Sequence, residues 1–269
     1  MMKPKQKELF RNKYGSWAVI TGASSGIGRE LSIRVAETGI DVVIIGRNRA
    51  SLEDLKFKIQ KTYSVDVEII VADLSEDGVN KVIEFTANKK VGLLIASAGF
   101  GTSGNFLLNS VHEEVNMLQV NCQALLELTH HFAQVFVNKG RGGIILLSSI
   151  VAFQGVPFSA NYAATKAYVQ SLAEALHEEL KQHNVNVLSA APGPVNSGFS
   201  ARANMKMGNT LNPKDISLPI LKALGKKTTV LPGYLTKLLV YSLRTVPRWG
   251  KVKIMKKVMG DMTKHQREL

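Results

Sequence analysis

Three side chains within residues 141–168 could together transfer a proton to a carbonyl oxygen. Tyr162 and Lys166 are four residues apart in a segment with helical periodicity, so they share one face of the expected helix. A nearby ammonium favours the phenolate, and we therefore expect Lys166 to lower the pKa of Tyr162 from its ordinary value of about 10. Such a phenol could exchange a proton with a substrate oxygen. Ser149 could donate a hydrogen bond to the same oxygen.

A strand and a helix must position these three side chains. Residues 143–147 are apolar, β-branched in part and preceded by glycines, which predicts a buried strand that ends at Ser148 and Ser149. From Ser159 onward, apolar residues recur at helical spacing, which predicts a helix that carries Tyr162 and Lys166.

The rest of the chain alternates between strand and helix patterns. Further strands are expected at 17–20, 40–45, 67–71, 91–96, 185–191 and 228–231. Further helices are expected from the turn at 21–28 to about 38, at 51–62, after Ser75 as a cap, at 111–138, and from Asn212 and Pro213 to about 224. This alternation predicts a single-domain α/β Rossmann fold, a doubly wound parallel sheet with its site beyond the carboxyl ends of the strands.

The turn at residues 21–28, TGASSGIG, has the residues needed to bind a dinucleotide phosphate. Gly22 permits a tight turn, Gly26 lets the backbone approach a phosphate, and Gly28 lets the helix pack on the strand. The spacing G-x-x-x-G-x-G differs from the general fingerprint G-x-G-x-x-G, but the physical roles are the same. The amino end of the following helix would face the pyrophosphate.

The end of the second strand favours NADP over NAD. An NAD enzyme usually has an acidic residue here for the ribose 2′-hydroxyl, and Asp41 is at the wrong end of the strand for that role. Arg47 could instead pair with a 2′-phosphate. The alternative for Arg47 is a solvated loop charge, which is our interpretation of Arg49.

Ser149 and the run Asn161-Tyr162-Ala163-Ala164-Thr165-Lys166, together with the glycine-rich turn, resemble the short-chain dehydrogenase/reductase family over most of the chain. The resemblance implies that Ser149, Tyr162 and Lys166 are catalytic. It also implies a fourth catalytic residue, Asn121, which would hold a proton-relay water near the lysine. The alternative for Asn121 is a structural one, in which its side chain caps a helix irregularity.

The resemblance also implies the contacts of the cofactor. The residues expected to bind it are Gly22, Ser24, Ser25, Gly26, Ile27, Gly28, Arg47, Asp73, Leu74, Ser97, Ala98, Gly99, Tyr162, Lys166, Pro192, Gly193, Val195 and Ser197. Asp73 and Leu74 would lie against the adenine, and the turn from Pro192 to Ser197 against the nicotinamide. Ser97 replaces the family's usual Asn, and Ser197 keeps the hydroxyl of its usual Thr. Residues 199–209 would form an apolar lid.

The expected activity is NADPH-dependent interconversion of a ketone or aldehyde with an alcohol, on an apolar or lipid-like substrate. No metal is expected, because Ser149 and Tyr162 would supply the electrophilic assistance. A non-catalytic, NADP(H)-binding regulatory protein on the same fold is the alternative. Such a protein should have lost Tyr162 or Lys166, and this chain retains both.

The net charge of +13 is concentrated at the ends of the chain. Residues 1–13 contribute +4 and residues 234–269 contribute +7, which leaves +2 for the 220 residues between them. We therefore divide the chain into a basic amino-terminal extension (1–13), a catalytic domain (14–233) and a basic amphipathic carboxyl-terminal extension (234–269). The extensions lack a nucleic-acid reading motif or an aromatic stacking platform, so no nucleic-acid partner is expected.

Pro247 divides the carboxyl-terminal extension into two helical pieces. They could pack on the body or on a partner subunit, or the second piece could lie on an anionic membrane surface with Trp249 at the interface. A homo-oligomer, dimer or tetramer, is expected. The single cysteine, Cys122, and the lack of a signal-peptide pattern predict a cytoplasmic location, with peripheral membrane association as the alternative.

Overall fold

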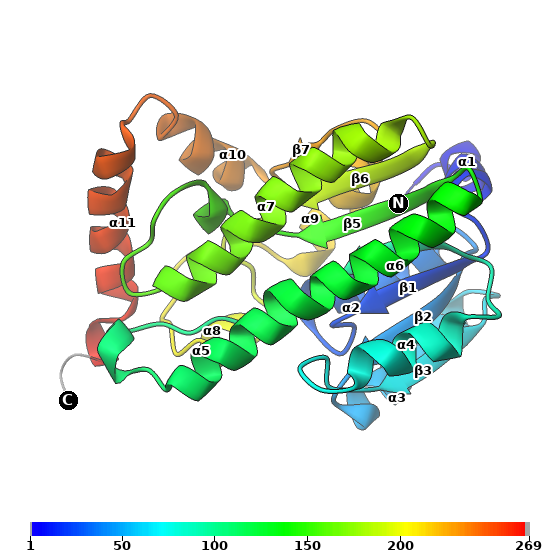
Figure 1. The fold of residues 1–269 in the computed structure, drawn as a ribbon, viewed down its shortest axis with the longest axis horizontal. Coiled ribbons are helices and arrows are strands. Elements are labelled where there is room, and N and C mark those ends of the chain that lie inside the picture. The colour runs from blue at the N-terminus through cyan, green and yellow to red at the C-terminus, as the bar shows by residue number, and fades with distance from the viewer. Residues whose placement is uncertain (1, 267–269) are drawn as a thin grey trace.

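A seven-stranded parallel sheet forms the centre of the molecule (Figure 1). The computed structural model describes residues 2–266. The strands are β1 (Trp17–Thr21), β2 (Asp41–Gly46), β3 (Val67–Val71), β4 (Val91–Ala96), β5 (Gly142–Leu147), β6 (Val185–Ala190) and β7 (Thr229–Val230). Their order is β3-β2-β1-β4-β5-β6-β7, which is the doubly wound arrangement predicted from the sequence. The order of the strands reverses between β1 and β4, and in such sheets ligands bind at this switch point.

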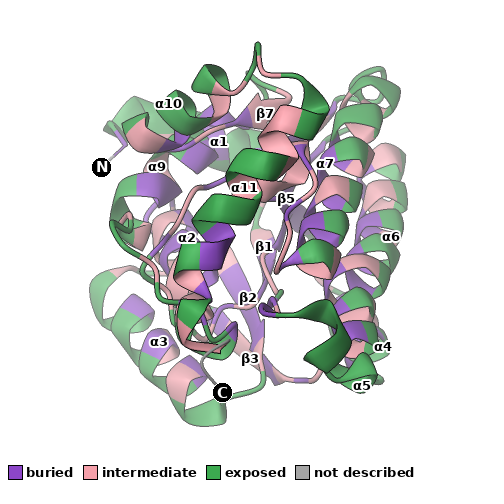
Figure 2. Ribbon diagram, turned by 90° about the vertical axis from the view of Figure 1, so that its left-hand side faces the viewer, coloured by how far each residue is buried: buried purple, intermediate pink, exposed green. Residues whose placement is uncertain are grey.

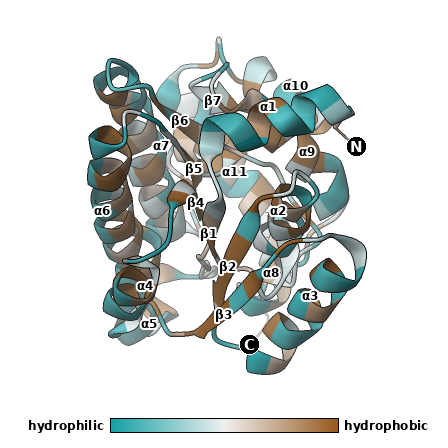
Figure 3. Cartoon of the chain, turned by 90° about the vertical axis from the view of Figure 1, so that its right-hand side faces the viewer, coloured by the Kyte–Doolittle hydropathy of each residue, from teal (hydrophilic) through white to brown (hydrophobic). Residues whose placement is uncertain are grey.

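Helices cover both faces of the sheet and bury its apolar side chains. The α-helices are α1 (Pro4–Tyr14), α2 (Gly26–Ala36), α3 (Arg49–Thr62), α4 (Gly78–Thr86), α5 (Val111–Leu118), α6 (Leu125–Asn138), α7 (Ala160–Lys181), α8 (Phe199–Arg202), α9 (Pro213–Ala223), α10 (Tyr234–Ser242) and α11 (Arg248–Met262). In β1, Ala18 and Ile20 belong to the core under α1, α2, α3 and α9, whereas Val19 belongs to the core under α4, α6 and α7. Burial on both faces explains why most strand residues are apolar (Figure 3).

The predicted spans of β3 and β4 agree with the structure, and two local predictions are wrong. The last strand has two residues, Thr229–Val230, instead of four. Ser75 does not cap the next helix, because α4 begins at Gly78 after Asp77. Instead, the backbone N–H and the hydroxyl of Ser75 both donate to Asp73 Oδ1, at 3.0 and 2.7 Å, and so hold the turn after β3.

The helix predicted over 111–138 contains an irregular turn. Between α5 and α6, residues Gln119–Ala124 form a π-helical turn, which inserts an extra residue into the helix. Asn121 lies in this turn and is fully buried. The π-helical turn therefore contains Asn121, which the sequence analysis named as a candidate catalytic residue.

The amino-terminal extension is a helix that packs on the body. Phe10 and Tyr14 on α1 are buried, and the Tyr14 hydroxyl donates to Asn186 Oδ1 at 2.9 Å. Lys7 pairs with Glu37 at 3.1 Å. The sequence analysis described residues 1–13 only by their charge and did not predict this helix. Its few apolar residues dock it on the body. Residue 1 lies outside the described residues.

The carboxyl-terminal extension forms α10 and α11, separated near Pro247 as predicted, and α11 lies across one end of the molecule (Figures 1 and 2). Met259 is buried, Lys206 N–H donates to Met262 O at 3.0 Å, and Gln266 Nε2 donates to Ser103 Oγ at 2.9 Å. The extension thus packs on the body of its own chain. Residues 267–269 lie outside the described residues. Within residues 2–266, no helix is both long and apolar enough to cross a membrane.

Candidate active site

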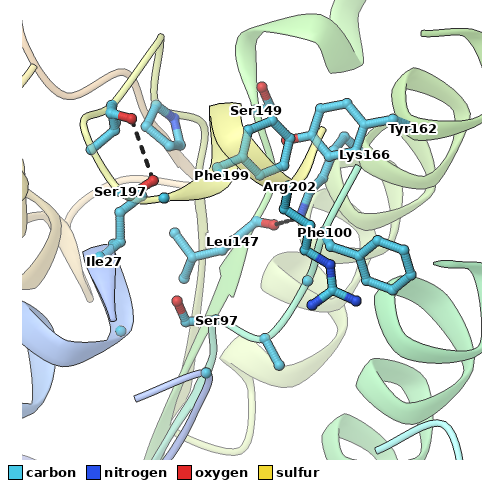
Figure 4. Close-up of a pocket in the computed structure, with 18 of the residues that line it drawn as sticks. Ile27, Ser97, Phe100, Leu147, Ser149, Tyr162, Lys166, Ser197, Phe199 and Arg202 are labelled. Atoms are coloured by element: carbon cyan, nitrogen blue, oxygen red, sulfur yellow. Dashed lines mark hydrogen bonds between the residues drawn. The ribbon is translucent and has the colours of Figure 1, made fainter. Parts of the chain in front are cut away.

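A cavity of about 440 Å³ lies beyond the carboxyl ends of the strands (Figure 4). It extends from the turn between β1 and α2, past the ends of β4 and β5, to α8 and α11. Ser149 and all of the residues predicted to bind the cofactor line this cavity. The structure thus brings together residues from distant parts of the chain, and their roles in binding remain predictions.

The glycine-rich turn packs closely on its neighbours because it has no side chain at three positions. Gly22 has φ +66°, and a Cβ there would lie 2.8 Å from Ala98 Cα. A Cβ at Gly28 would collide with the carbonyl oxygen of Gly22, and one at Gly26 would lie 2.7 Å from Ser197 Cβ. The amino end of α2, where peptide N–H groups are free to bind an anion, therefore opens directly into the cavity. These residues fit a dinucleotide cofactor.

Thr21 holds the facing wall of the cofactor region, and the sequence analysis did not single it out. Its Oγ1 accepts hydrogen bonds from Ser97 N–H at 3.1 Å and from Ala98 N–H at 3.0 Å. These bonds fix the backbone that follows β4 against the end of β1. The sequence feature that could have identified Thr21 was its hydroxyl at the end of the first strand.

Three of the four predicted catalytic side chains, Ser149, Tyr162 and Lys166, lie together at the carboxyl end of β5 (Figure 4). Lys166 is buried on α7, and its Nζ donates to Leu147 O at 2.7 Å. The Tyr162 ring lies beside Phe199 of α8, with the ring centroids 5.0 Å apart. Lys166 Nζ is 5.8 Å from the centre of the Tyr162 ring. The lysine is therefore near the phenol but bonded to the sheet.

The expected lowering of the Tyr162 pKa is wrong for the protein as described. Burial raises the pKa of Tyr162 to about 12, and a hydrogen bond with Ser149 only partly opposes this. Burial also lowers the pKa of Lys166 to about 8. In both cases the loss of water disfavours the charged form, and this outweighs the proximity that the spacing indicated. The phenol is thus held as a proton donor.

Asn121 is bonded entirely to protein groups and does not line the cavity. Its Oδ1 accepts from Phe100 N–H at 3.1 Å, and its Nδ2 donates to Phe100 O at 2.8 Å and to Thr165 Oγ1 at 3.1 Å. Asn121 thus joins the loop after β4 to α7, a structural role that differs from the predicted cap of a helix irregularity. A Cβ at Gly99 would lie 3.0 Å from Asn121 Oδ1 and 3.4 Å from Lys166 Nζ, so the lysine is close. The relay role stays a prediction.

Arg47 and Asp73 form an ion pair at the rim of the cavity, with Nη1 and Oδ2 3.4 Å apart. Although partial burial raises the pKa of Asp73, hydrogen bonds from Ser75 and Arg47 hold it below the ordinary value. Arg47 is half exposed. Its guanidinium is therefore available to an anion at the end of β2.

A second arginine, Arg202 of α8, also lines the cavity, and the sequence analysis missed it. Its guanidinium carbon lies 4.0 Å from the centre of the Phe100 ring. Burial lowers the pKa of Arg202, and the positive charge of Arg47 lowers it further. The sequence feature that could have identified Arg202 was the presence of an arginine within a segment predicted to be an apolar lid.

The wall opposite the glycine-rich turn is apolar and is built largely from the carboxyl-terminal extension. The extension supplies Leu239, Met255, Val258, Met259 and Met262 to the cavity. Phe199, Met205 and Met207 of the predicted lid line it as well. Methionines are flexible and suit an apolar chamber that adapts to its ligand. The sequence signal for this wall was the helical spacing of Met255, Met259 and Met262.

The family model for short chain dehydrogenases matches residues 16–208, which include the glycine-rich turn and the Tyr162–Lys166 pair. The chain belongs to this family. It is an oxidoreductase that acts on hydroxyl or carbonyl groups and binds a nicotinamide dinucleotide. Among residues 2–266, no cluster of His, Cys, Asp and Glu side chains is arranged to hold a metal ion.

Relatives and solved structures of this family cover most of the chain. The 7beta-hydroxysteroid dehydrogenase of Clostridium sardiniense is 30% identical over 236 residues, 85% of this chain and 89% of that protein. The very-long-chain 3-oxoacyl-CoA reductase of Vanderwaltozyma polyspora is 29% identical over 88% of this chain and 71% of that protein. A short-chain dehydrogenase from Sphingobium yanoikuyae, solved with NADPH, is 26% identical, with a TM-score of 0.77 over 92% of this chain and 96% of that one.

Replacing Asn121 with Ala should destabilise the fold. The change leaves Phe100 N–H, Phe100 O and Thr165 Oγ1 without their buried partner, at a cost of about 2 to 4 kcal/mol in the free energy of unfolding. Urea unfolding measures the effect, with exposed Asn80→Ala on α4 as the control. An unchanged unfolding midpoint with reduced turnover would instead support a pure relay role.

Proposed function

We propose that this protein is an NADPH-dependent reductase that converts an apolar, lipid-like ketone or aldehyde into an alcohol, and that it also supports the reverse reaction. The observation that carries the proposal is the continuity of the cavity. It connects the glycine-rich turn and Arg47 to Tyr162, and then to a methionine-lined chamber. A cofactor and an apolar substrate would therefore meet at the phenol.

Tyr162 would act as the general acid. Burial keeps its Oη protonated at neutral pH, so the proton is available to a carbonyl oxygen that lies within hydrogen-bonding distance. Ser149 would donate a second hydrogen bond to that oxygen and orient it. Bound NADPH would supply the hydride to the carbonyl carbon. One proton and one hydride complete the reduction to an alcohol.

Lys166 would supply positive charge beneath the reacting oxygen. Its hydrogen bond to Leu147 O fixes the ammonium at the end of β5. As the phenol gives up its proton, this ammonium stabilises the developing phenolate.

The preference for NADPH would come from arginine side chains near the end of β2. No carboxylate follows β2 at residues 46–49, and Arg47 lines the cavity there. Arg202 lies close enough to Arg47 for the charge of Arg47 to lower the pKa of Arg202. Two guanidinium groups favour a 2′-phosphate over a hydroxyl. The related structure from Sphingobium yanoikuyae, which holds NADPH, supports this proposal.

The substrate would be lipid-like, such as a steroid or a long-chain acyl carbonyl. Phe199 and five methionines, Met205, Met207, Met255, Met259 and Met262, line the chamber. Apolar chambers of this kind bind ligands chiefly by removing apolar surface from water. The names of the two relatives, a hydroxysteroid dehydrogenase and a very-long-chain oxoacyl-CoA reductase, favour the same class.

We also propose that the protein is a cytoplasmic homo-oligomer. Val111, Val115 and Leu118 recur at helical spacing on α5, and all three are exposed. Such an apolar stripe favours burial against a second subunit. The alternative of a non-catalytic regulatory protein is disfavoured, because Ser149, Tyr162 and Lys166 are retained and share one cavity.

Arg47→Ala should reduce the preference for NADPH over NADH. Losing a charge-assisted hydrogen bond removes about 1.5 to 3 kcal/mol, so the ratio of the two dissociation constants should fall by roughly 10- to 150-fold. Fluorescence titration of both cofactors measures the ratio. Arg49→Ala is a matched control, since it removes the same charge two residues away. Equal affinities for NADPH and NADH in the wild type would contradict the proposal.

Tyr162→Phe should lower turnover by about 10² or more, because the general acid is lost, while NADPH affinity changes little. Tyr168→Phe, on the same helix but partly exposed, serves as the control and should retain turnover. Steady-state assays on a panel of steroid and long-chain carbonyls measure the effect. Near wild-type turnover of Tyr162→Phe on a good substrate would sink the mechanism.

The rate of carbonyl reduction should fall as the pH rises through about 8. Burial lowers the pKa of Lys166 to this value, so its ammonium is present below pH 8 and lost above it. The Tyr162 proton, with a pKa of about 12, is retained over the same range. Profiles of kcat/KM between pH 6 and about 9.5 should show this fall in the wild type. Lys166→Met should give a low, level profile, and a level profile in the wild type would contradict the assignment.

A further inference from the structure

The helix α10 exposes an apolar stripe to solvent. Tyr234, Leu238 and Tyr241 recur at positions i, i+4 and i+7, and are 81, 51 and 57% exposed. In contrast, Thr236 is buried and accepts a hydrogen bond from Gly193 N–H at 3.2 Å, so the opposite side of α10 docks on the body. More than half of each side chain in the outward stripe therefore remains exposed to solvent.

The helix α11 has two different faces. Met255, Met259 and Met262 face the cavity. Trp249, Lys253 and Lys256, also at positions i, i+4 and i+7, are all exposed on another face. Lys253 Nζ lies 5.1 Å from the centre of the Trp249 ring. One face of α11 thus closes the chamber, and the other presents an aromatic ring among lysines.

A third exposed apolar group lies next to the carboxyl end of α11. The short helix η1 (Phe106–Leu108) exposes three successive apolar side chains, each by 60% or more. The hydrogen bond between Gln266 and Ser103 connects the chain after α11 to the loop that carries η1. Figure 1 shows α10 and α11 at the same end of the molecule, beyond the carboxyl ends of the strands. We call these exposed residues of α10, α11 and η1 the docking surface.

The charge of this region has one sign. Residues 234–262 contain seven basic side chains, Lys237, Arg244, Arg248, Lys251, Lys253, Lys256 and Lys257, and one acidic side chain, Asp261. The catalytic domain of 220 residues has a net charge of only +2. The positive potential is therefore local to the docking surface, which suits an anionic partner.

We propose that the docking surface binds the face of an anionic lipid membrane. Tyrosine and tryptophan favour the headgroup region, where their rings are partly apolar and partly polar, and neighbouring lysines add attraction to anionic headgroups. An acidic protein would match the lysines, but it would not account for apolar side chains exposed at three separate places. A membrane surface has no fixed shape, so it can accept the apolar side chains at all three places.

This docking would place the substrate chamber at the membrane. Leu239 and Val258 line the cavity and are also partly exposed, 39 and 38%, so the chamber reaches solvent between α10 and α11. A lipid-dissolved carbonyl could therefore enter with little transit through water. This consequence rests on the proposed function, whereas the docking itself does not depend on catalysis.

Co-sedimentation of the full chain with vesicles tests the proposal. The protein should bind vesicles that contain phosphatidylglycerol and remain in the supernatant with phosphatidylcholine alone. Raising the ionic strength from about 0.01 to 0.15 M shortens the Debye length from about 30 to 8 Å, and should weaken binding. Truncation is unsuitable, because α11 forms a wall of the chamber.

Point variants identify the surface, and each has a matched control on α3. Lys253→Glu/Lys256→Glu should weaken partitioning by about 30-fold or more, since each basic residue near such a surface contributes roughly a factor of five. Lys58→Glu/Lys61→Glu gives the same net charge and should bind normally. Trp249→Ser should weaken partitioning by at least about tenfold, whereas Phe57→Ser, at a residue equally exposed (66%), should not.

Three results would overturn the proposal. These are a wild type that stays in the supernatant with anionic vesicles at low salt, equal binding to both vesicle types, and equal losses in the α3 controls. A Trp249→Ser variant that instead changes the oligomeric state in light scattering would assign the surface to a second copy. Activity on a soluble ketone without vesicles should be unchanged in all four variants, which separates a failure of docking from a failure of the proposed function.

Discussion

The buried ammonium of Lys166 is the constraint on which the site depends. A charged group without water is unfavourable unless it is hydrogen-bonded, and Leu147 O supplies the bond at the end of β5. Ser148 Oγ donates in turn to Lys166 O at 3.0 Å, and Asn121 Nδ2 donates to Oγ1 of Thr165, the residue before Lys166. These bonds hold α7 in one register against the sheet. Tyr162, one turn earlier on the same helix, is positioned as a result.

The carboxyl-terminal extension has two structural tasks that conflict with a simple division into domains. It lies outside residues 16–208, which the family model covers, yet its methionines line the same cavity as the glycine-rich turn. Its lysines, on another face of the same helix, face solvent. Residues at helical spacing share one face of a helix, so α11 can present methionines to the cavity on one face and lysines to solvent on another.

Much of the fold and the site could be predicted from the sequence, because their signals are local. Continuous apolar runs such as 17–20 and 91–96 predict buried strands, and Gly22, Gly26 and Gly28 predict the phosphate turn from the absence of side chains at these positions. Contacts between distant segments could not be predicted in the same way. The contact between Arg202 and Phe100 joins α8 to the loop after β4, and α1 is held by side chains whose partners lie elsewhere in the chain.

The pKa of Tyr162 shows most clearly what spacing cannot reveal. A lysine four residues away on a helix suggests attraction between opposite charges, but the strength of that attraction depends on what else surrounds the phenol. Here Phe199 packs on the ring, and a Cβ at Gly101 would lie 3.0 Å from it. This packing reduces the contact of the phenol with water, and burial raises its pKa. Burial thus raises a pKa that the spacing alone would have lowered.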